Sequence, residues 1–208
     1  MYIPEFNRVE DSGTINSFLT ANPFAILVST RDGVPFATHL PLLSKIHGDT
    51  LLLIGHVARA NPHWTCMQEG RESLAIFHGP HAYVSPSLYE GRENVPTWNY
   101  ATVHVYGQAT VFSDEARLTD VLEEMIKTFE SAYMGQWRDL TAKYREGMLR
   151  HIVGFEMRAT RVEAKFKLSQ NRPPNEQSRV MKSLMESESS SICDTGKMME
   201  SISRCPKK

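Results

Sequence analysis

The chain has 208 residues, of which 41% are hydrophobic. That is enough for one substantial core but not for two independent ones, so we expect one main domain. Its 23 Lys and Arg residues oppose 24 Asp and Glu residues, for a formal net charge of -1. No global positive field therefore draws the chain to DNA or to an anionic membrane, and any nucleic-acid contact must come from a local patch.

The cysteines and the N-terminal sequence indicate a cytoplasmic protein. Cys66, Cys193 and Cys205 are widely spaced and form no Cys-x-x-Cys pair, which disfavours a disulfide framework or a structural zinc site. The first ten residues lack a basic region followed by an apolar run, and no segment approaches the roughly 20 apolar residues that span a bilayer. We expect neither secretion nor membrane insertion.

The sequence pattern up to residue 112 predicts mainly strands. A short helix at residues 15–19 ends at Asn22-Pro23. Asp32-Gly33 predicts a tight hairpin turn. A second turn at residues 47–49 precedes a strand whose nearly unbroken apolar sequence indicates that both of its faces are covered, as in a closed barrel. Another short helix is expected between residues 58 and 67. The predicted strands lie at residues 24–28, 34–43, 50–54, 74–77, 82–89 and 99–112.

The remainder predicts helices around one long strand. Ser113 is expected to cap a helix whose apolar positions recur every three or four residues up to Phe129. An amphipathic segment at 140–149 precedes a strand at 152–168 with alternating apolar and polar faces. One weak helix and a polar, mobile tract at 186–191 are expected to follow. The fold class is therefore mainly β with peripheral helices, with a domain over residues 1–171 and a C-terminal tail over 172–208.

No motif of a common enzyme class is present. The chain has no GxGxxG after a strand, no GxxxxGK[ST], no HExxH and no GxSxG. The histidines do not combine with acidic or thiol residues at metal-ligand spacing, so no metal site is predicted. His39, His56 and His104 are the candidate proton donors if the chain catalyses a reaction. We assign none of them as catalytic.

The segment from Gly55 to Trp64 combines a strand end, an arginine and a helix start within one turn. Backbone N–H groups at the helix start and the forked charge of Arg59 would point at one anion, such as a phosphate. His39 on the preceding strand could add a donor. The alternative is that Arg59 is a surface charge, Asn61 caps the helix and His56 is a satisfied turn residue.

A second candidate segment, Pro96 to Tyr100, places a large aromatic side chain between a hydroxyl and an amide where a loop enters a strand. Trp98 or Tyr100 could stack on a flat heteroaromatic ring such as an isoalloxazine, and Thr97 and Asn99 could reach its polar atoms. The alternative is an aromatic strand start that fills the core.

Six blocks of sequence together carry a resemblance to a known family. They read MYIP (1–4), ATHLP (37–41), GHVARANP (55–62), GPHAYVSP (79–86), VPTWNY (95–100) and KLSQNR (167–172). In this order the blocks resemble the PaiB-type negative transcriptional regulators. The resemblance implies an FMN-binding split β-barrel that forms homodimers, with FMN as the cofactor and the flavin site at the subunit interface.

By analogy with split-barrel phosphate sites, the resemblance also implies particular binding residues. Those for the FMN phosphate are Thr38, His39, Leu40, His56, Ala58, Arg59, Ala60 and Asn61. Thr97, Trp98 and Asn99 would line the flavin ring, with the partner chain as one source. The chain departs from the family pattern after Pro174, which leaves the role of the C-terminal tail open.

Two functions remain open at this point. One is an FMN-binding negative transcriptional regulator without enzymatic activity, for which DNA is a candidate partner. The other is a flavin-dependent oxidoreductase or flavin reductase, because the same fold serves both. No helix-turn-helix is recognisable, and the near-neutral charge predicts weak nonspecific DNA binding. The haem-degrading split-barrel proteins provide a third, weaker option.

Overall fold

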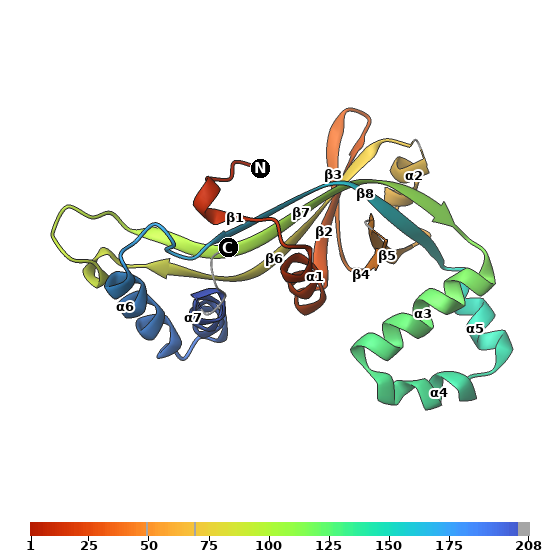
Figure 1. Ribbon diagram of the computed structural model, residues 1–208. Coiled ribbons are helices and arrows are strands. Elements are labelled where there is room, and N and C mark those ends of the chain that lie inside the picture. The colour runs from red at the N-terminus through yellow and green to blue at the C-terminus, as the bar shows by residue number, and fades with distance from the viewer. Residues whose placement is uncertain (49, 69, 204–208) are drawn as a thin grey trace. The chain divides into compact units, whose positions relative to one another are not determined.

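The computed structural model describes residues 1–48, 50–68 and 70–203, and its strands form one eight-stranded sheet (Figure 1). Their order is β3-β2-β6-β7-β8-β5-β4, with β1 pairing β8, and every described register is antiparallel. The strands are β1 (Arg8–Val9), β2 (Phe24–Arg31), β3 (Val34–Pro41), β4 (Leu43–His47), β5 (Thr50–Ala58), β6 (Glu72–Val84), β7 (Thr97–Phe112) and β8 (Ile152–Lys167).

Seven α-helices accompany these strands within the described residues. They are α1 (Ser12–Ala21), α2 (His63–Gln68), α3 (Glu115–Phe129), α4 (Met134–Asp139), α5 (Ala142–Leu149), α6 (Pro174–Met185) and α7 (Ser190–Ser203). None of the helices in this part of the chain is long and apolar enough to cross a membrane.

The chain divides into two compact units. The first unit comprises residues 1–15, 78–103 and 163–203, and the second comprises residues 16–77 and 104–162. Strands β6, β7 and β8 each contribute residues to both units.

The second unit begins its sheet with the predicted hairpin. Asp32 and Gly33 form the turn between β2 and β3 with φ angles of 51° and 79°, the left-handed region that a two-residue hairpin turn requires. The strands alternate between buried and exposed positions as half-covered strands do. The core side chains that are at most 1% exposed include Leu19, Leu27, Leu53, Phe77, Val105, Leu118, Phe155 and Met157.

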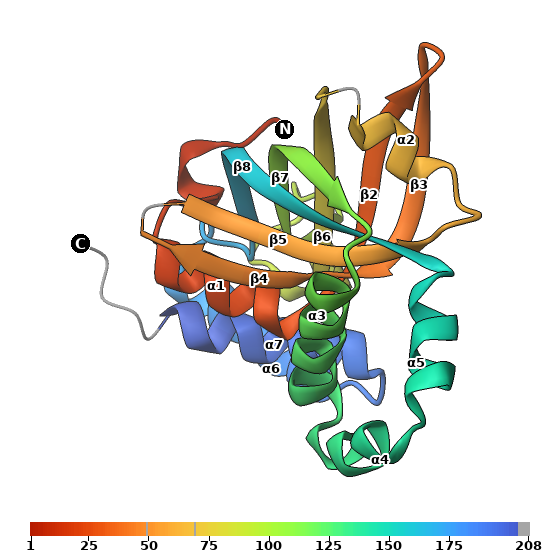
Figure 2. The ribbon, with the colours of Figure 1, turned by 90° about the vertical axis from the view of Figure 1, so that its right-hand side faces the viewer.

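Helix α3 carries the apolar stripe that the sequence predicts. Val121 and Met125 pack with Leu43 and Ile54, so the helix lies against β4 and β5 (Figure 2). The predicted cap at Ser113 is wrong by one residue, because the side chain of Asp114 accepts the backbone N–H of the first turn. A carboxylate at this position also interacts favourably with the helix dipole.

Helix α4 is an element that the sequence did not predict. It has only six residues, and no side chain caps its start. Its buried residue is Trp137, whose indole Nε1 donates a hydrogen bond to Glu123 Oε1 at 3.3 Å. A helix of six residues with one buried side chain leaves little periodic signal in the sequence.

The first unit pairs β1 with the end of β8 and places α6 and α7 side by side (Figure 1). The sequence predicts one helix followed by a mobile tract, but the structure has two helices here. Gly196 explains their close approach, since a Cβ at this position would lie 2.7 Å from Met185 Cγ. The helices bury Val180, Leu184 and Met199.

The structure also bears on several smaller predictions. The strand predicted at 82–89 ends at Val84, because Ser85 accepts the N–H of Ser87 and starts a 3-10 helix at Pro86–Leu88. Cys66 and Cys193 are free thiols. The predicted turn at 47–49 includes Asp49, which lies outside the described residues. Cys205 also lies outside them, within residues 204–208.

Gly107 provides a test of the close packing of β7 on β8 in the second unit. A Cβ at this position would lie 2.3 Å from the carbonyl oxygen of Arg158, which is backbone and cannot rotate away. We predict that Gly107→Ala lowers the free energy of unfolding in urea by about 2 kcal/mol or more, as for an overpacked core. Gly147→Ala in α5 meets nothing within 4 Å and should instead gain about 0.5–1 kcal/mol. A Gly107→Ala protein as stable as the wild type would contradict this packing.

Candidate functional site

The predicted phosphate segment forms a strand-to-helix corner in the second unit. Strand β5 ends at Ala58, and α2 begins at His63. Asn61 Oδ1 accepts the backbone N–H of His63 at 3.0 Å, and the Asn61 N–H donates to the Ala58 carbonyl at 2.9 Å. Asn61 therefore caps the helix, which is the local role that the sequence left open as an alternative.

A chain of side-chain hydrogen bonds runs from this corner into the core. Asn61 Nδ2 donates to Thr38 Oγ1 at 3.0 Å, and Thr38 Oγ1 lies 2.8 Å from His63 Nδ1. His63 Nε2 lies 2.9 Å from Ser29 Oγ, which lies 2.7 Å from Ser73 Oγ. Because buried polar groups are costly unless bonded, this chain fixes the start of α2 against β2, β3 and β6.

His63 is the central residue of this chain, and sequence reasoning missed it. Its side chain is fully buried, with an edge contact to the ring of Phe36 at 5.2 Å between centroids. Burial lowers the pKa of His63 to about 4, so the ring is neutral at physiological pH. A neutral imidazole offers one donor and one acceptor, as the two hydroxyl contacts require. Its only sequence signal was its place two residues after Asn61.

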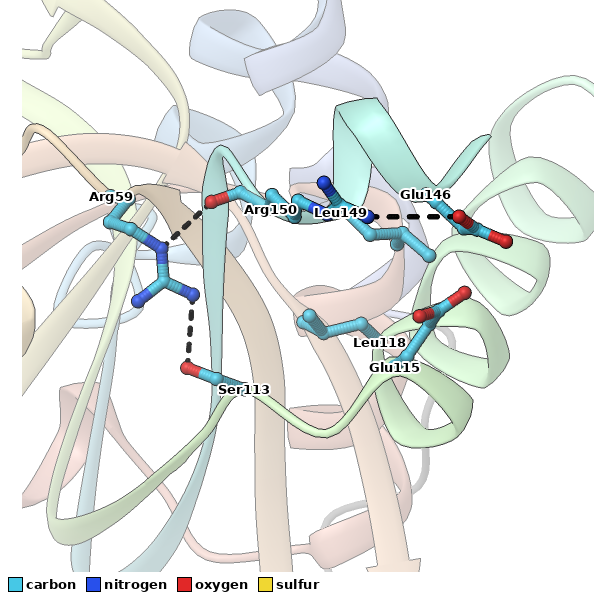
Figure 3. Close-up of a pocket in the computed structure, with 7 residues that line it drawn as sticks. All are labelled: Arg59, Ser113, Glu115, Leu118, Glu146, Leu149 and Arg150. Atoms are coloured by element: carbon cyan, nitrogen blue, oxygen red, sulfur yellow. Dashed lines mark hydrogen bonds and ion pairs between the residues drawn. The ribbon is translucent and has the colours of Figure 1, made fainter. Parts of the chain in front are cut away.

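Arg59 clamps the corner to the turn between α5 and β8 (Figure 3). Its Nε donates to the Arg150 carbonyl at 2.8 Å, and its Nη2 donates to Ser113 Oγ at 3.1 Å and to the Ile152 carbonyl at 3.0 Å. All three acceptors are neutral. Among the described residues, no carboxylate lies within ion-pair distance of the Arg59 guanidinium, and its Nη1 has no hydrogen-bond partner. The guanidinium is held rigidly but keeps its charge.

A pocket of about 310 Å³ opens beside this guanidinium. Figure 3 shows Leu118 and Leu149 between Arg59 on one side and two glutamates on the other. Arg150 pairs with Glu146 at 3.7 Å, whereas Arg59 has no such partner within the described part of the chain. The residues that line the pocket are Arg59, Ser113, Glu115, Leu118, Glu146, Leu149 and Arg150. Arg59 therefore borders open space rather than packed protein.

The other residues predicted to bind the phosphate differ in their exposure and in their hydrogen-bonding groups. His39 is exposed on β3, so its ring can reach a ligand, whereas Leu40 is buried and serves only packing. His56 is half-buried on β5, where burial lowers its pKa, and within the described residues its Nδ1 has no hydrogen-bond partner. Ala58 and Ala60 are exposed and, with small side chains, leave room for close approach.

The three ring candidates belong to the first unit. Trp98 is 53% exposed, and its ring meets that of Tyr83 edge-on at 5.9 Å between centroids. Thr97 Oγ1 accepts a hydrogen bond from the Lys167 ammonium group. Asn99, in contrast, is fully buried, and its Nδ2 donates to Ser169 Oγ at 2.9 Å. Of the three side chains, only the Trp98 ring lies open to a planar ligand.

These groups match the chemistry of FMN. A phosphate ester is bound by charged N–H donors, and Nη1 of Arg59, which makes no hydrogen bond within the described residues, fits that need. Glu115 and Glu146 line the opposite side of the pocket (Figure 3). An isoalloxazine needs an exposed aromatic surface, which Trp98 supplies. Among the described residues, no group of three or more His, Cys, Asp or Glu side chains gathers at metal-binding geometry.

The fold and these groups define a split-barrel flavin-binding protein. Residues 1–161 match the family model described as "Putative FMN-binding domain". The chain is 37% identical over 203 residues to "Protease synthase and sporulation protein PAI 2" of Bacillus subtilis (strain 168), a match that covers 96% of this chain and 97% of that protein. The chain belongs to this PaiB-like family of FMN-binding proteins, and FMN is its cofactor.

Two solved structures share the fold. The flavocytochrome Anf3 from Azotobacter vinelandii has a TM-score of 0.61 at 18% identity, covering 79% of this chain and 72% of that chain. The FAD and heme binding protein from Mycobacterium smegmatis has a TM-score of 0.61 at 17% identity, covering 82% and 78% respectively. These structures confirm the predicted fold class, and the family match confirms the predicted cofactor. The homodimer and the individual site residues remain predictions.

The buried hydrogen-bond chain can be tested through the pH dependence of stability. Since the folded pKa of His63 is about 4 and the unfolded value is 6.5, the unfolded chain binds more protons between these values. Stability from neutral His63 is therefore present above pH 6.5 and decreases by about 3 kcal/mol as pH falls to 4. We predict that His63→Gln flattens this part of the unfolding profile, measured by urea titrations at several pH values.

Two further variants complete this test. His63→Leu should lower stability at pH 7, because it removes one buried hydrogen-bond partner from each of Thr38 and Ser29. His47→Gln, at an exposed side chain, should reproduce the wild-type pH profile. Identical pH profiles for His63→Gln and the wild type would refute the role given to His63.

Proposed function

We propose that this chain holds FMN by its phosphate at the Arg59 corner and acts as an FMN-binding negative transcriptional regulator in the cytoplasm. The observation that carries the proposal is the Arg59 guanidinium, fixed by three neutral acceptors beside a pocket and still carrying its uncompensated charge. Such a pre-oriented cation binds a phosphate without the cost of ordering a free side chain.

The phosphate-binding role divides among the corner residues. Arg59 Nη1 and the imidazoles of His39 and His56 would donate hydrogen bonds to the phosphate oxygens. Ala58 and Ala60 would allow the phosphate to approach the backbone closely. Thr38 and Asn61 act indirectly, because their side chains are engaged in holding α2 through His63, and Leu40 supports β3 from the core.

The ring-binding role falls mainly on Trp98. Its exposed indole would contact the isoalloxazine, while Thr97 orients Lys167 and the buried Asn99 holds the strand that presents the indole. We propose that Trp98 serves the site as part of a homodimer, with the partner chain supplying the ring contact. When bound, FMN supplies electron transfer, and the chain's own residues bind and orient it.

The regulatory role is supported by the similarity to a protein named for protease synthesis and sporulation. A chain of net charge -1 would contact DNA only through a local patch or a partner, so such binding should weaken steeply with salt. The free thiols Cys66 and Cys193 suit the reducing cytoplasm.

A flavin-dependent oxidoreductase is the second candidate function. The imidazole of His56 favours it, because burial lowers its pKa and thereby favours the neutral ring. A neutral imidazole of this kind can accept a proton from a substrate held beside a flavin.

The phosphate assignment predicts a difference between FMN and riboflavin. Arg59→Ala should weaken FMN binding by roughly tenfold to a hundredfold, because one charge-assisted hydrogen bond contributes about 1.5–3 kcal/mol. Riboflavin lacks the phosphate, so its affinity should change less than about threefold. Flavin fluorescence titrations of both ligands measure the two affinities.

A matched control separates charge from structure. Arg138→Ala removes an exposed arginine of α4 that does not line the pocket, and it should bind FMN as the wild type does. Equal FMN affinities for Arg59→Ala and the wild type would rule out the phosphate assignment.

The two candidate functions predict different activities of the FMN-loaded protein. A regulator should shift the DNA upstream of its own gene in a gel, with an affinity that falls about a thousandfold between 50 and 200 mM salt, as about six released counterions require. It should also oxidise NADH or NADPH no faster than free FMN does. Turnover at enzymatic rates without a DNA shift would instead establish the oxidoreductase.

A further inference from the structure

The first unit contains a pair of cations that the phosphate corner does not use. Lys165 and Lys167 lie two positions apart on β8 and therefore point to the same face of the sheet. Lys165 is only 8% exposed, and its Nζ donates to the Tyr2 carbonyl at 3.1 Å. Lys167 Nζ donates to Thr97 Oγ1 and, at 2.6 Å, to the Trp98 carbonyl. Each of these acceptors is neutral.

No carboxylate compensates this pair of charges. In the part of the chain that the structure describes, neither ammonium group has a carboxylate within ion-pair distance, and Glu163 on the same face bonds to the Met1 amino group. Nearby Arg172 already pairs with Glu176 at 3.5 Å. Burial, with the charges of Lys165 and Arg172, lowers the pKa of Lys167. Two partly buried like charges are unfavourable unless an anion joins them.

An exposed aromatic surface adjoins these cations. Trp98 and Tyr83 are 53% and 50% exposed, and the ring of His81 lies 6.2 Å from that of Trp98 between centroids. The Lys165 ammonium lies 5.3 Å from the centre of the Tyr100 ring. Large aromatic side chains this exposed are more typical of binding surfaces than of a solvent-facing sheet.

We propose that the surface formed by Tyr83, Trp98, Lys165 and Lys167 binds a small planar aromatic anion. The Lys167 ammonium would receive the carboxylate or phosphate group, and the Trp98 indole would receive the ring. The charge complementarity selects an anion, and the open indole selects a flat apolar body over an aliphatic one. The function of this anion as the second ligand of a flavin site rests on the proposed function, because Thr97 and Trp98 belong to both.

The test compares benzoate and phenyl phosphate with benzyl alcohol, a neutral molecule of similar shape. Each is titrated into the full chain, with and without saturating FMN, and followed by tryptophan fluorescence and by saturation-transfer NMR of the ligand. We expect benzoate or phenyl phosphate to bind at least tenfold more tightly than benzyl alcohol. The tighter of the two shows which anionic group the site prefers. The flavin-free titration tests this surface even if FMN is not retained.

Variants then test separately the lysine that would bind the anionic group and the indole that would bind the ring. Lys167→Gln should weaken benzoate at least tenfold and leave benzyl alcohol unchanged, whereas Lys182→Gln, at an exposed lysine of α6, should change neither. Trp98→Leu keeps the cations and should abolish the preference for benzoate over acetate. Benzoate binding no tighter than benzyl alcohol, or unaffected by both Lys167→Gln and Trp98→Leu, would overturn the proposal.

Discussion

The hydrogen bonds of His63 are the constraint on which the phosphate corner depends. A fully buried neutral imidazole joins the hydroxyl groups of Thr38 and Ser29, and through them the cap of α2 and the neighbouring strands. Because each buried polar atom must find a partner, the corner cannot shift without breaking several bonds at once. Arg59 projects from this fixed corner, so the position of its guanidinium is set before any ligand arrives.

The same electrostatic arrangement occurs at two places in the chain. Arg59 in the second unit and the Lys165–Lys167 pair in the first unit are held by carbonyl and hydroxyl oxygens rather than by carboxylates. Several other surface cations have acidic partners, as Lys45 has with Glu124. A cation fixed by neutral acceptors keeps its charge for a ligand. This is the reason for proposing Arg59 and the two lysines as binding groups.

Sequence patterns predicted the features that depend on neighbouring residues. The Asp32-Gly33 turn and the apolar stripe of α3 were readable because backbone conformation and helical periodicity are local. The network of His63 was not, because its partners Ser29 and Thr38 lie 34 and 25 residues before it in the sequence. The burial of Asn99 beside Met199 was equally hidden, since no helix was predicted after the polar tract at 186–191. Family resemblance identified the corner, but only the structure separates Arg59 from the supporting Thr38 and Asn61.

The central claim is that the free edge of the Arg59 guanidinium holds the phosphate of the flavin. The most direct measurement is a crystal structure of the protein with FMN bound. The account predicts phosphate oxygens within hydrogen-bond distance of Arg59 Nη1, with the contacts of Arg59 to Arg150 and Ile152 retained. A phosphate bound elsewhere, with Arg59 still facing an empty pocket, would contradict it.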